Sequence, residues 1–204
     1  MKGLELWTKI NALANTSKLS DQCLAGFPST VSLEGHGRGS SSSVTSRLIP
    51  DLKFGCHGTL VGLAVAVAFR HGQQDVKVQL WRENITHPGT YYKSGSDIPI
   101  VRSNPPCIRS RFTSMRGMFQ IFECALSEEA RVSVQPGDVL GLTLPPTTNT
   151  TLEIQFTIGG PKNYVFQHQL PSNVDLAEAD FVSSDLPQIT FLVVLGNTFQ
   201  AHMD

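Results

Sequence analysis

The sequence predicts an all-β protein, folded as an antiparallel, jelly-roll-like β-sandwich. Apolar and polar residues alternate in several short segments, and turn-forming residues separate these segments. Charged residues make up 16% of the 204 residues, compared with about 25% in an average soluble protein. No helical period is long enough to supply the crossover helices of a parallel sheet. Many short strands joined by turns are typical of a sandwich.

Two segments show the alternation most clearly. Residues 76–81 read VKVQLW and residues 152–158 read LEIQFTI, with an apolar side chain at every second position. This period of two predicts half-buried antiparallel strands, with the polar residues facing outward. Residues 122–126, 140–144 and 189–195 alternate in the same way, and the turn Gln135-Pro136-Gly137-Asp138 precedes the second of these.

The most apolar run in the chain, residues 59–69, has eleven uncharged residues. A helix needs about 20 residues to cross the hydrocarbon core of a membrane, so this run is too short to span one as a helix. Large side chains alternate with small ones along it, which predicts a long central strand buried on both faces. We expect a loop, the N-terminal segment or another molecule to cover the small face, formed by Gly62, Ala64, Ala66 and Ala68.

The chain divides into a short N-terminal segment, residues 1–20, and a single β-sandwich domain, residues 21–200. Apolar residues recur at intervals of three near the N-terminus, which predicts a short amphipathic helix or a docking segment. The length of the remainder suits one sizeable hydrophobic core. The apolar residues of the first segment are Leu4, Trp7, Ile10 and Leu13.

Composition and motifs argue against several classes of function. A formal net charge of -1 gives no surplus of positive charge for a nucleic acid. Residues 35–43 are rich in glycine and serine but do not match the GxGxxG pattern, so we expect a flexible loop there. Turn aspartates such as Asp51, Asp97 and Asp138 lack the spacing of a calcium loop and are expected to accept backbone N–H groups.

No catalytic residue, metal site or cofactor is predicted, and we expect a non-enzymatic protein. The chain has no nucleophile elbow of the GxSxG type, and the six histidines lack the spacing that assembles zinc. A hydrolase would need acid and base groups clustered in a cleft, and no such cluster is visible in the sequence. The histidines are His36, His57, His71, His87, His168 and His202.

Cysteines and glycosylation sequons favour an extracellular or cell-surface protein. Four cysteines without metal spacing suit disulfides, and of the three possible connectivities we favour Cys23 with Cys56 and Cys107 with Cys124. Three sequons begin at Asn15, Asn84 and Asn149, each in a polar or turn-like context that suits a glycoprotein.

The beginning of the chain does not resemble an export signal. Glu5 and Lys9 fall where a signal peptide would need an unbroken apolar segment. We therefore expect either a cytosolic protein or part of a longer exported one, and the cysteines and sequons favour the second.

Aromatic residues beside a loop are the candidate binding residues. Trp81, Arg82, Tyr91 and Tyr92 flank the loop at residues 82–90 and suit contact with a protein or a sugar ring. Core packing is the alternative for at least one of the aromatics. A second candidate loop covers residues 145–151, and we expect both loops at one end of the sandwich. A glycan on Asn84 would obstruct a binding surface next to it.

Three segments together resemble a module of large surface receptors of sponges and other marine invertebrates. They are residues 50–60 (PDLKFGCHGTL), residues 78–82 (VQLWR) and residues 134–141 (VQPGDVLG), and the tyrosine pair at residues 91–92 lies between the last two. The resemblance covers residues 48–144 and implies an extracellular location and a β-rich fold beside other adhesion domains. It carries no functional residues over, and the matching residues read as scaffold positions.

The expected function is recognition or adhesion as part of a larger cell-surface or secreted protein. The partner would be a protein or glycan ligand on a cell surface or in the matrix, and self-association is a further possibility. The alternative is a carbohydrate-binding jelly-roll module, which would use exposed aromatic side chains on one sheet face.

Overall fold

The computed structural model describes residues 23–28, 31, 36–37, 42–100, 107–109 and 119–195. The predicted N-terminal segment, residues 1–20, lies outside the described residues. No helix among the described residues is long and apolar enough to cross a membrane. The described strands and 3-10 helices are β1 (Leu24–Ala25), β2 (His36–Gly37), β3 (Thr45–Phe54), β4 (Gly58–Phe69), β5 (Val76–Glu83), β6 (Thr90–Lys93), β7 (Ile98–Ile100), β8 (Cys107–Arg109), β9 (Gln120–Ala125), η1 (Glu128–Ala130), β10 (Val132–Val134), β11 (Val139–Leu144), β12 (Leu152–Phe166), β13 (Asn173–Asp175), η2 (Leu176–Glu178), β14 (Phe181–Pro187) and β15 (Ile189–Leu195).

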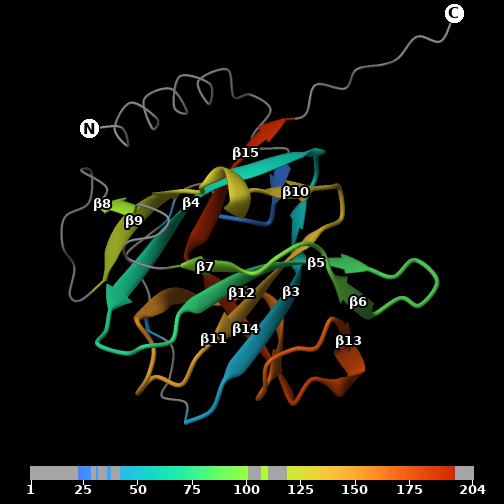
Figure 1. Ribbon diagram of the computed structural model, residues 1–204. Coiled ribbons are helices and arrows are strands. Elements are labelled where there is room, and N and C mark those ends of the chain that lie inside the picture. The colour runs from blue at the N-terminus through green and yellow to red at the C-terminus, as the bar shows by residue number, and fades with distance from the viewer. Residues whose placement is uncertain are drawn as a thin grey trace, which may run out of the picture.

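The strands form two antiparallel sheets packed face to face, which confirms the predicted all-β sandwich (Figure 1). The first sheet, called sheet A, has the order β13-β6-β5-β11-β3-β12, with β14 on the far side of β12. The second, sheet B, is built on β4, which pairs with β9, β10, β12 and β15. The long strand β12 joins both sheets, because its start pairs with β4 and its end pairs with β3.

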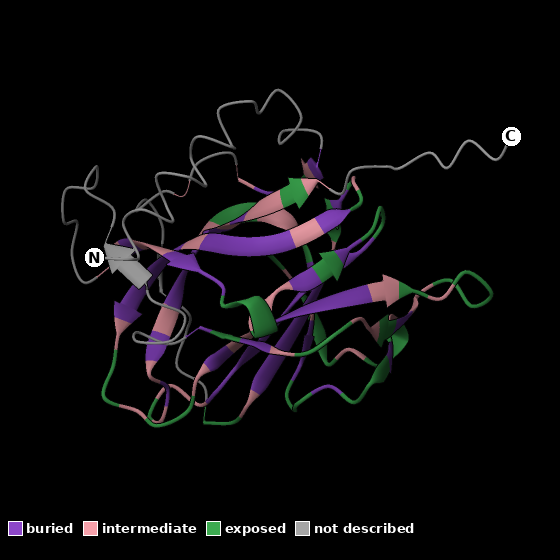
Figure 2. Cartoon of the chain, turned by 45° about the horizontal axis from the view of Figure 1, so that its top comes forward, coloured by how far each residue is buried: buried purple, intermediate pink, exposed green. Residues whose placement is uncertain are grey.

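The main core lies between the two sheets. The apolar positions predicted on residues 76–81 and 140–144 face inward together, because Leu80 pairs with Leu140 and Val78 with Leu142. Buried residues concentrate on the strands and exposed residues on the connecting loops (Figure 2). The predicted closing strand is also confirmed, with Ile189 and Phe191 buried in the same core.

The apolar run forms β4, and it is a central strand as predicted. Leu63, Val65 and Val67 belong to the core between the sheets, while Ala66 and Ala68 on the small face are also buried. A register irregularity lies in β15 between Leu192, which pairs with Gly62, and Val193, which pairs with Leu60. Val61 is therefore an extra residue of β4 with no partner in β15. Because of this extra residue, Leu60 and Leu63 both face the core although they are three positions apart.

A second apolar cluster covers part of the outer face of sheet A. The segment between β12 and β14, residues 167–180, folds back over this face with β13 and η2. Its Leu170 and Val174 join residues that point outward from the sheet, among them Leu48, Trp81 and Val139. A distant segment therefore covers the outward face of β5 at Trp81, whereas Lys77 on the same face stays partly exposed.

Gly141 makes room for the Trp81 side chain in this second cluster. A Cβ added at Gly141 would collide with Nε1 and Cδ1 of the indole ring. We therefore expect Gly141→Ala to lower the free energy of unfolding by about 1–3 kcal/mol, measured by urea denaturation. Ser133→Ala, at an exposed position of β10, is the control and should change it by less than about 0.5 kcal/mol. Equal losses in the two variants would refute this packing role.

Candidate functional site

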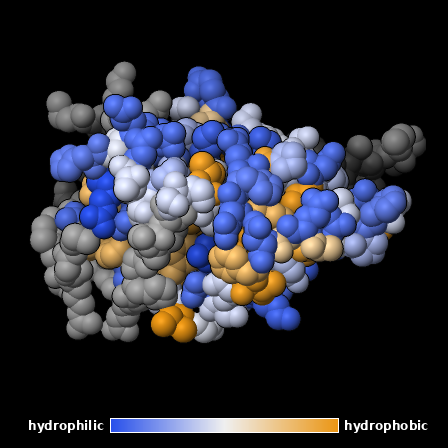
Figure 3. Space-filling view, turned by 90° about the horizontal axis from the view of Figure 1, so that it is seen from below, coloured by the Kyte–Doolittle hydropathy of each residue, from blue (hydrophilic) through white to orange (hydrophobic). Residues whose placement is uncertain are grey.

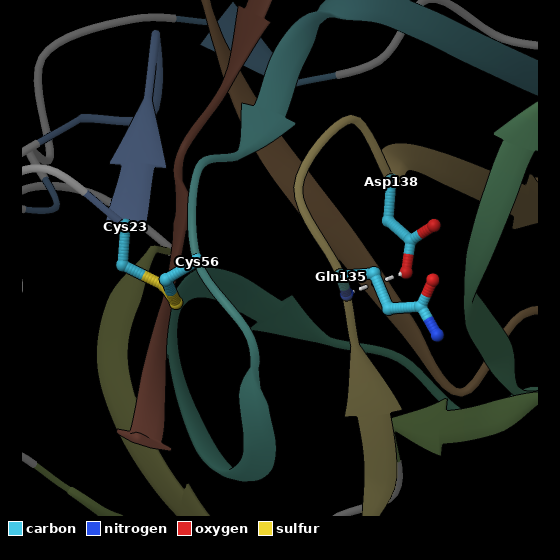
Figure 4. Close-up of a disulfide and its surroundings, with 4 residues drawn as sticks. All are labelled: Cys23, Cys56, Gln135 and Asp138. Carbon is cyan, nitrogen blue, oxygen red and sulfur yellow. Dashed lines mark hydrogen bonds between the residues drawn. A yellow bond between two sulfur atoms is a disulfide. The ribbon is translucent and has the colours of Figure 1, made fainter. Parts of the chain in front are cut away.

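The segments that carry the receptor resemblance meet in the folded chain. Asp138 is the last residue of the predicted turn and is completely buried. Its carboxylate accepts hydrogen bonds from Arg82 Nε at 2.7 Å and Nη2 at 3.0 Å. The backbone N–H of Gln135 donates to the same carboxylate at 2.9 Å (Figure 4). Asp138 therefore accepts a turn N–H as predicted, and it also ties β5 to the start of β11.

The third segment is fastened to the same turn. Phe54 N donates to the carbonyl of Asp138, and Gly137 N donates to the carbonyl of Phe54, each at 2.8 Å. Two residues later, Cys56 forms a disulfide with Cys23, which confirms one of the favoured pairings. The disulfide and the turn lie in the same region of the molecule (Figure 4).

The contacts of Arg82 show a structural role for this predicted binding residue. Its hydrogen bonds to Asp138 raise the pKa of Arg82, although burial opposes the shift. The guanidinium also donates to Ser94 Oγ at 3.3 Å, and its side chain is 28% exposed. The bidentate bond to a buried carboxylate fixes Nε and Nη2 of Arg82 within the scaffold.

The predicted aromatic binding residues do not share one surface. Trp81 and Tyr91 are buried in the second apolar cluster, so neither is available to stack on a ligand. Burial raises the pKa of Tyr91 to about 12. Tyr92 is 39% exposed and lies next to Arg82, whose Cζ is 6.0 Å from the ring centroid. Tyr92 is thus the member of the predicted set with a substantially exposed side chain.

The two predicted binding loops lie at opposite ends of sheet A, and the expectation of a shared end is wrong. β5 and β11 are antiparallel neighbours, with Trp81 opposite Val139 and Lys77 opposite Thr143. The loop at residues 82–90 follows the first of these pairs, whereas residues 145–151 follow the second. Figure 1 shows the β5–β6 hairpin projecting from one side, away from the turn between β4 and β5.

A pocket of about 310 Å³ lies at the second of these ends. Its floor includes Thr143, Lys77 and Pro99, which are register neighbours across β11, β5 and β7 on the outer face of sheet A. Pro145, Gln169 and the residues just before β5, Gln74 and Asp75, also line the pocket. The predicted loop at residues 145–151 thus contributes its first residue, Pro145, to this pocket.

Buried polar side chains support the pocket floor. Ser46 Oγ lies 3.3 Å from Thr143 Oγ1, which donates to Gln79 Oε1 at 3.2 Å. Gln79 Nε2 in turn donates to Asp97 Oδ1 at 2.9 Å. We call Ser46, Thr143, Gln79 and Asp97 the polar ladder, because they connect β3, β11 and β5 to the loop before β7. Such a connected network holds its members in fixed orientations.

Lys77, which lines the pocket, is held by the charged end of the polar ladder. Asp97 accepts from Lys93 Nζ at 3.1 Å, and Lys77 Nζ lies 3.6 Å from its other oxygen. Burial opposes ionisation of Asp97, but the hydrogen bonds from Gln79 and Lys93 outweigh it and lower its pKa. The pocket itself presents the ammonium group of Lys77, the carboxylate of Asp75, two amides and a hydroxyl, a mixture that suits a small polar ligand of low net charge.

The mouth of the pocket is braced by backbone pairing. Gln74 forms an isolated bridge with Thr150, and the hydroxyl of Thr151 donates to Asp75 Oδ1 at 2.9 Å. Gln73 N donates to Asn149 Oδ1 at 3.2 Å. These contacts hold the loop at residues 145–151 against the residues that precede β5.

The described residues include some, but not all, of the remaining predicted disulfide and glycosylation sites. Cys124 is disulfide-bonded, and the backbone of Cys107 pairs directly opposite it. The side chain of Cys107 lies outside the described residues, so this pairing stays a prediction. Asn15 also lies outside them, whereas Asn84 and Asn149 are described. No group of three or more potential metal-ligating residues is found within the described part of the chain.

No family model, curated protein or solved structure matches the chain. The fold and the site therefore define its class by themselves. The chain is a disulfide-bonded antiparallel β-sandwich with a polar pocket on the outer face of one sheet.

Proposed function

We propose that this protein is a non-enzymatic extracellular recognition or adhesion module, part of a larger cell-surface or secreted protein. The resemblance to surface-receptor modules supports this, and so does the Cys23–Cys56 disulfide, which suits an oxidising compartment. The motif residues with described contacts, Arg82 and Asp138 above all, act as scaffold. Binding is then left to surfaces outside the motif.

In this proposal the pocket is the binding site, and the pocket is the observation on which the proposal mainly rests. Its floor is rigid, because the polar ladder and four neighbouring strands fix Thr143 and Lys77. Its rim comes from residues outside the three matching segments, including Gln169 and Gln74. A rigid floor with a rim made of loop residues is the arrangement of many binding modules, in which loops on a scaffold select the ligand.

Carbohydrate binding is the alternative function, and the pocket favours it in one respect. Hydroxyl and amide groups with a balanced pair of charges suit the hydroxyls of a sugar. A platform of aromatic side chains is not supported, because Trp81 and Tyr91 are buried. The alternative therefore rests on hydrogen bonding in the pocket rather than on stacking.

The test is a printed array of glycans and extracellular-matrix proteins, probed with the oxidised chain on fluorescent beads. We expect at least one ligand to bind, and we expect Gln169→Trp to weaken that binding at least tenfold by filling the pocket. Gln167→Trp is the matched control, because Gln167 is also exposed but does not line the pocket. Equal binding by both variants would contradict the pocket as the site, and glycan hits alone would favour the alternative.

A further inference from the structure

The β5–β6 hairpin carries the sequon Asn84-Ile85-Thr86 at its tip. Asn84 Oδ1 accepts two hydrogen bonds from Thr86, one from the backbone N at 3.1 Å and one from Oγ1 at 2.8 Å. This is an Asx turn, closed by the sequon's own hydroxyl. Nδ2 of Asn84 donates to no residue among those described, so the nitrogen that would carry a glycan remains available.

The tip is open to large groups. Ile85 is 95% exposed, and Thr86, His87 and Pro88 are exposed as well. The hairpin projects from the body of the sandwich (Figure 1). Apolar groups on the face seen from below lie in small clusters separated by polar ones (Figure 3). The exposed Ile85 thus stands on a projecting turn, next to Asn84, which is itself partly exposed.

The base of the hairpin keeps this turn in place. Asn84 N donates to the carbonyl of Thr90 at 2.8 Å, and His87 N donates to the carbonyl of Asn84 at 3.1 Å. Gly89 N donates to Glu83 Oε1 at 3.0 Å. The sequon therefore keeps its Asx turn in the folded protein, on a support anchored through Arg82 to the buried Asp138.

The sequon at Asn149 is arranged differently. Its Oδ1 accepts from Gln73 N, and its threonine hydroxyl, on Thr151, donates to Asp75 rather than to the asparagine. The middle residue, Thr150, is only 2% exposed. A glycan on Asn149 would stand beside the pocket mouth, whereas one on Asn84 would stand at the opposite end of β5.

We propose that Asn84 is an N-glycosylation site, and that its glycan marks the hairpin end as the end that faces away from the ligand. This rests on the extracellular location proposed above. In the reaction, a bond forms between Asn84 Nδ2 and the first sugar carbon of a lipid-linked oligosaccharide diphosphate. The bond from that carbon to the diphosphate breaks, and one amide proton leaves as the diphosphate is released. A glycan excludes partners from the hairpin and directs them to the pocket.

To test this, the full chain is secreted from mammalian cells. Its glycopeptides are then mapped by mass spectrometry before and after peptide-N-glycosidase treatment. We expect a glycan on Asn84, its loss in Asn84→Gln and Thr86→Ala, and its retention in the matched control Thr86→Ser. Asn149→Gln should leave the Asn84 glycan in place. An unmodified Asn84 in secreted wild type, with the other sequons occupied or empty, would overturn the proposal.

The experiments distinguish a failure of the pocket proposal from a failure of the glycosylation proposal. Array binding that is insensitive to Gln169→Trp would remove the pocket as the recognition site and leave the glycan map unchanged. An unmodified Asn84 with pocket-dependent binding would remove only the glycan. Asn84→Gln should bind the array ligand within twofold of wild type, because the hairpin lies away from the pocket, and a tenfold loss would contradict the orientation that the glycan marks.

Discussion

Replacing Arg82 with methionine should lower the free energy of unfolding by about 3–5 kcal/mol, because it leaves the buried carboxylate of Asp138 without its cation. Asp138 has no exposed surface, and Arg82 donates two of the three hydrogen bonds that its carboxylate accepts from described residues. Methionine keeps an unbranched stem of similar length, so most of the packing is retained. Urea denaturation followed by circular dichroism measures the loss.

An exposed ion pair supplies the control for this variant. Arg131 Nη1 lies 3.9 Å from Glu128 Oε1, and the glutamate side chain is 85% exposed. Glu128→Gln should therefore change stability by only about 0–1 kcal/mol. In a double-mutant cycle, Arg82→Met combined with Asp138→Asn should cost less than the sum of the two single variants. Additive losses, or a loss at Arg82 as small as that at Glu128, would show that the pair does not hold the turn.

Removing the disulfide with Cys23→Ser and Cys56→Ser should lower the free energy of unfolding by about 2–5 kcal/mol. The two cysteines are 33 residues apart in sequence, and for a loop of this size the chain-entropy model gives about 4 kcal/mol. Cys23 is also buried in the main core beside Phe27. The bond fixes β1 next to the end of β3, where Leu24 pairs with Phe54.

The single variants test whether the bond itself is responsible. Cys23→Ser, Cys56→Ser and the double variant should each lose at least about 2 kcal/mol, because each removes the same cross-link. The two variants that contain Cys23→Ser should lose about 1–3 kcal/mol more, because they place a hydroxyl in the core. Denaturation of the three proteins under identical oxidising conditions makes the comparison. A double variant as stable as wild type would refute a stabilising role for this disulfide.

The strands could be predicted from the sequence, because a period of two depends only on near neighbours in the chain. β4, β5, β11 and β15 were predicted in this way and are present. The alternation in residues 152–158 continues to Phe156 but fails at Ile158, which is exposed, because the register of β12 shifts after this residue. Gly159 has a φ of +83° there, a conformation that interrupts regular strand geometry.

What covers a polar strand face could not be predicted. Three polar residues at outward positions of strands with an alternating pattern are nevertheless buried: Gln79, Thr143 and Gln155. Residues 167–180 fold over part of sheet A from a distant place in the sequence. A period of two identifies the two faces of a strand but does not tell whether a remote segment covers the second one.

The candidate site was predicted least well, because long-range pairing creates it. Trp81 and Tyr91 were predicted as binding residues and are buried, and a tryptophan among the polar positions of β5 was the available signal of a second core. The pocket draws residues from five separate stretches between Val44 and Gln169. Arg82 and Asp138 were both part of the quoted motif, but only the strand register shows that they meet.

Hydrogen–deuterium exchange tests the central claim most directly, by comparing the free module with the module saturated by its array ligand. The central claim is that the shared motif builds the scaffold while the pocket end recognises the ligand. Ligand should slow exchange in residues 72–77 and 143–151, which surround the pocket, and leave residues 84–90 of the hairpin unchanged. Slower exchange confined to the hairpin, with the pocket segments unaffected, would contradict the account.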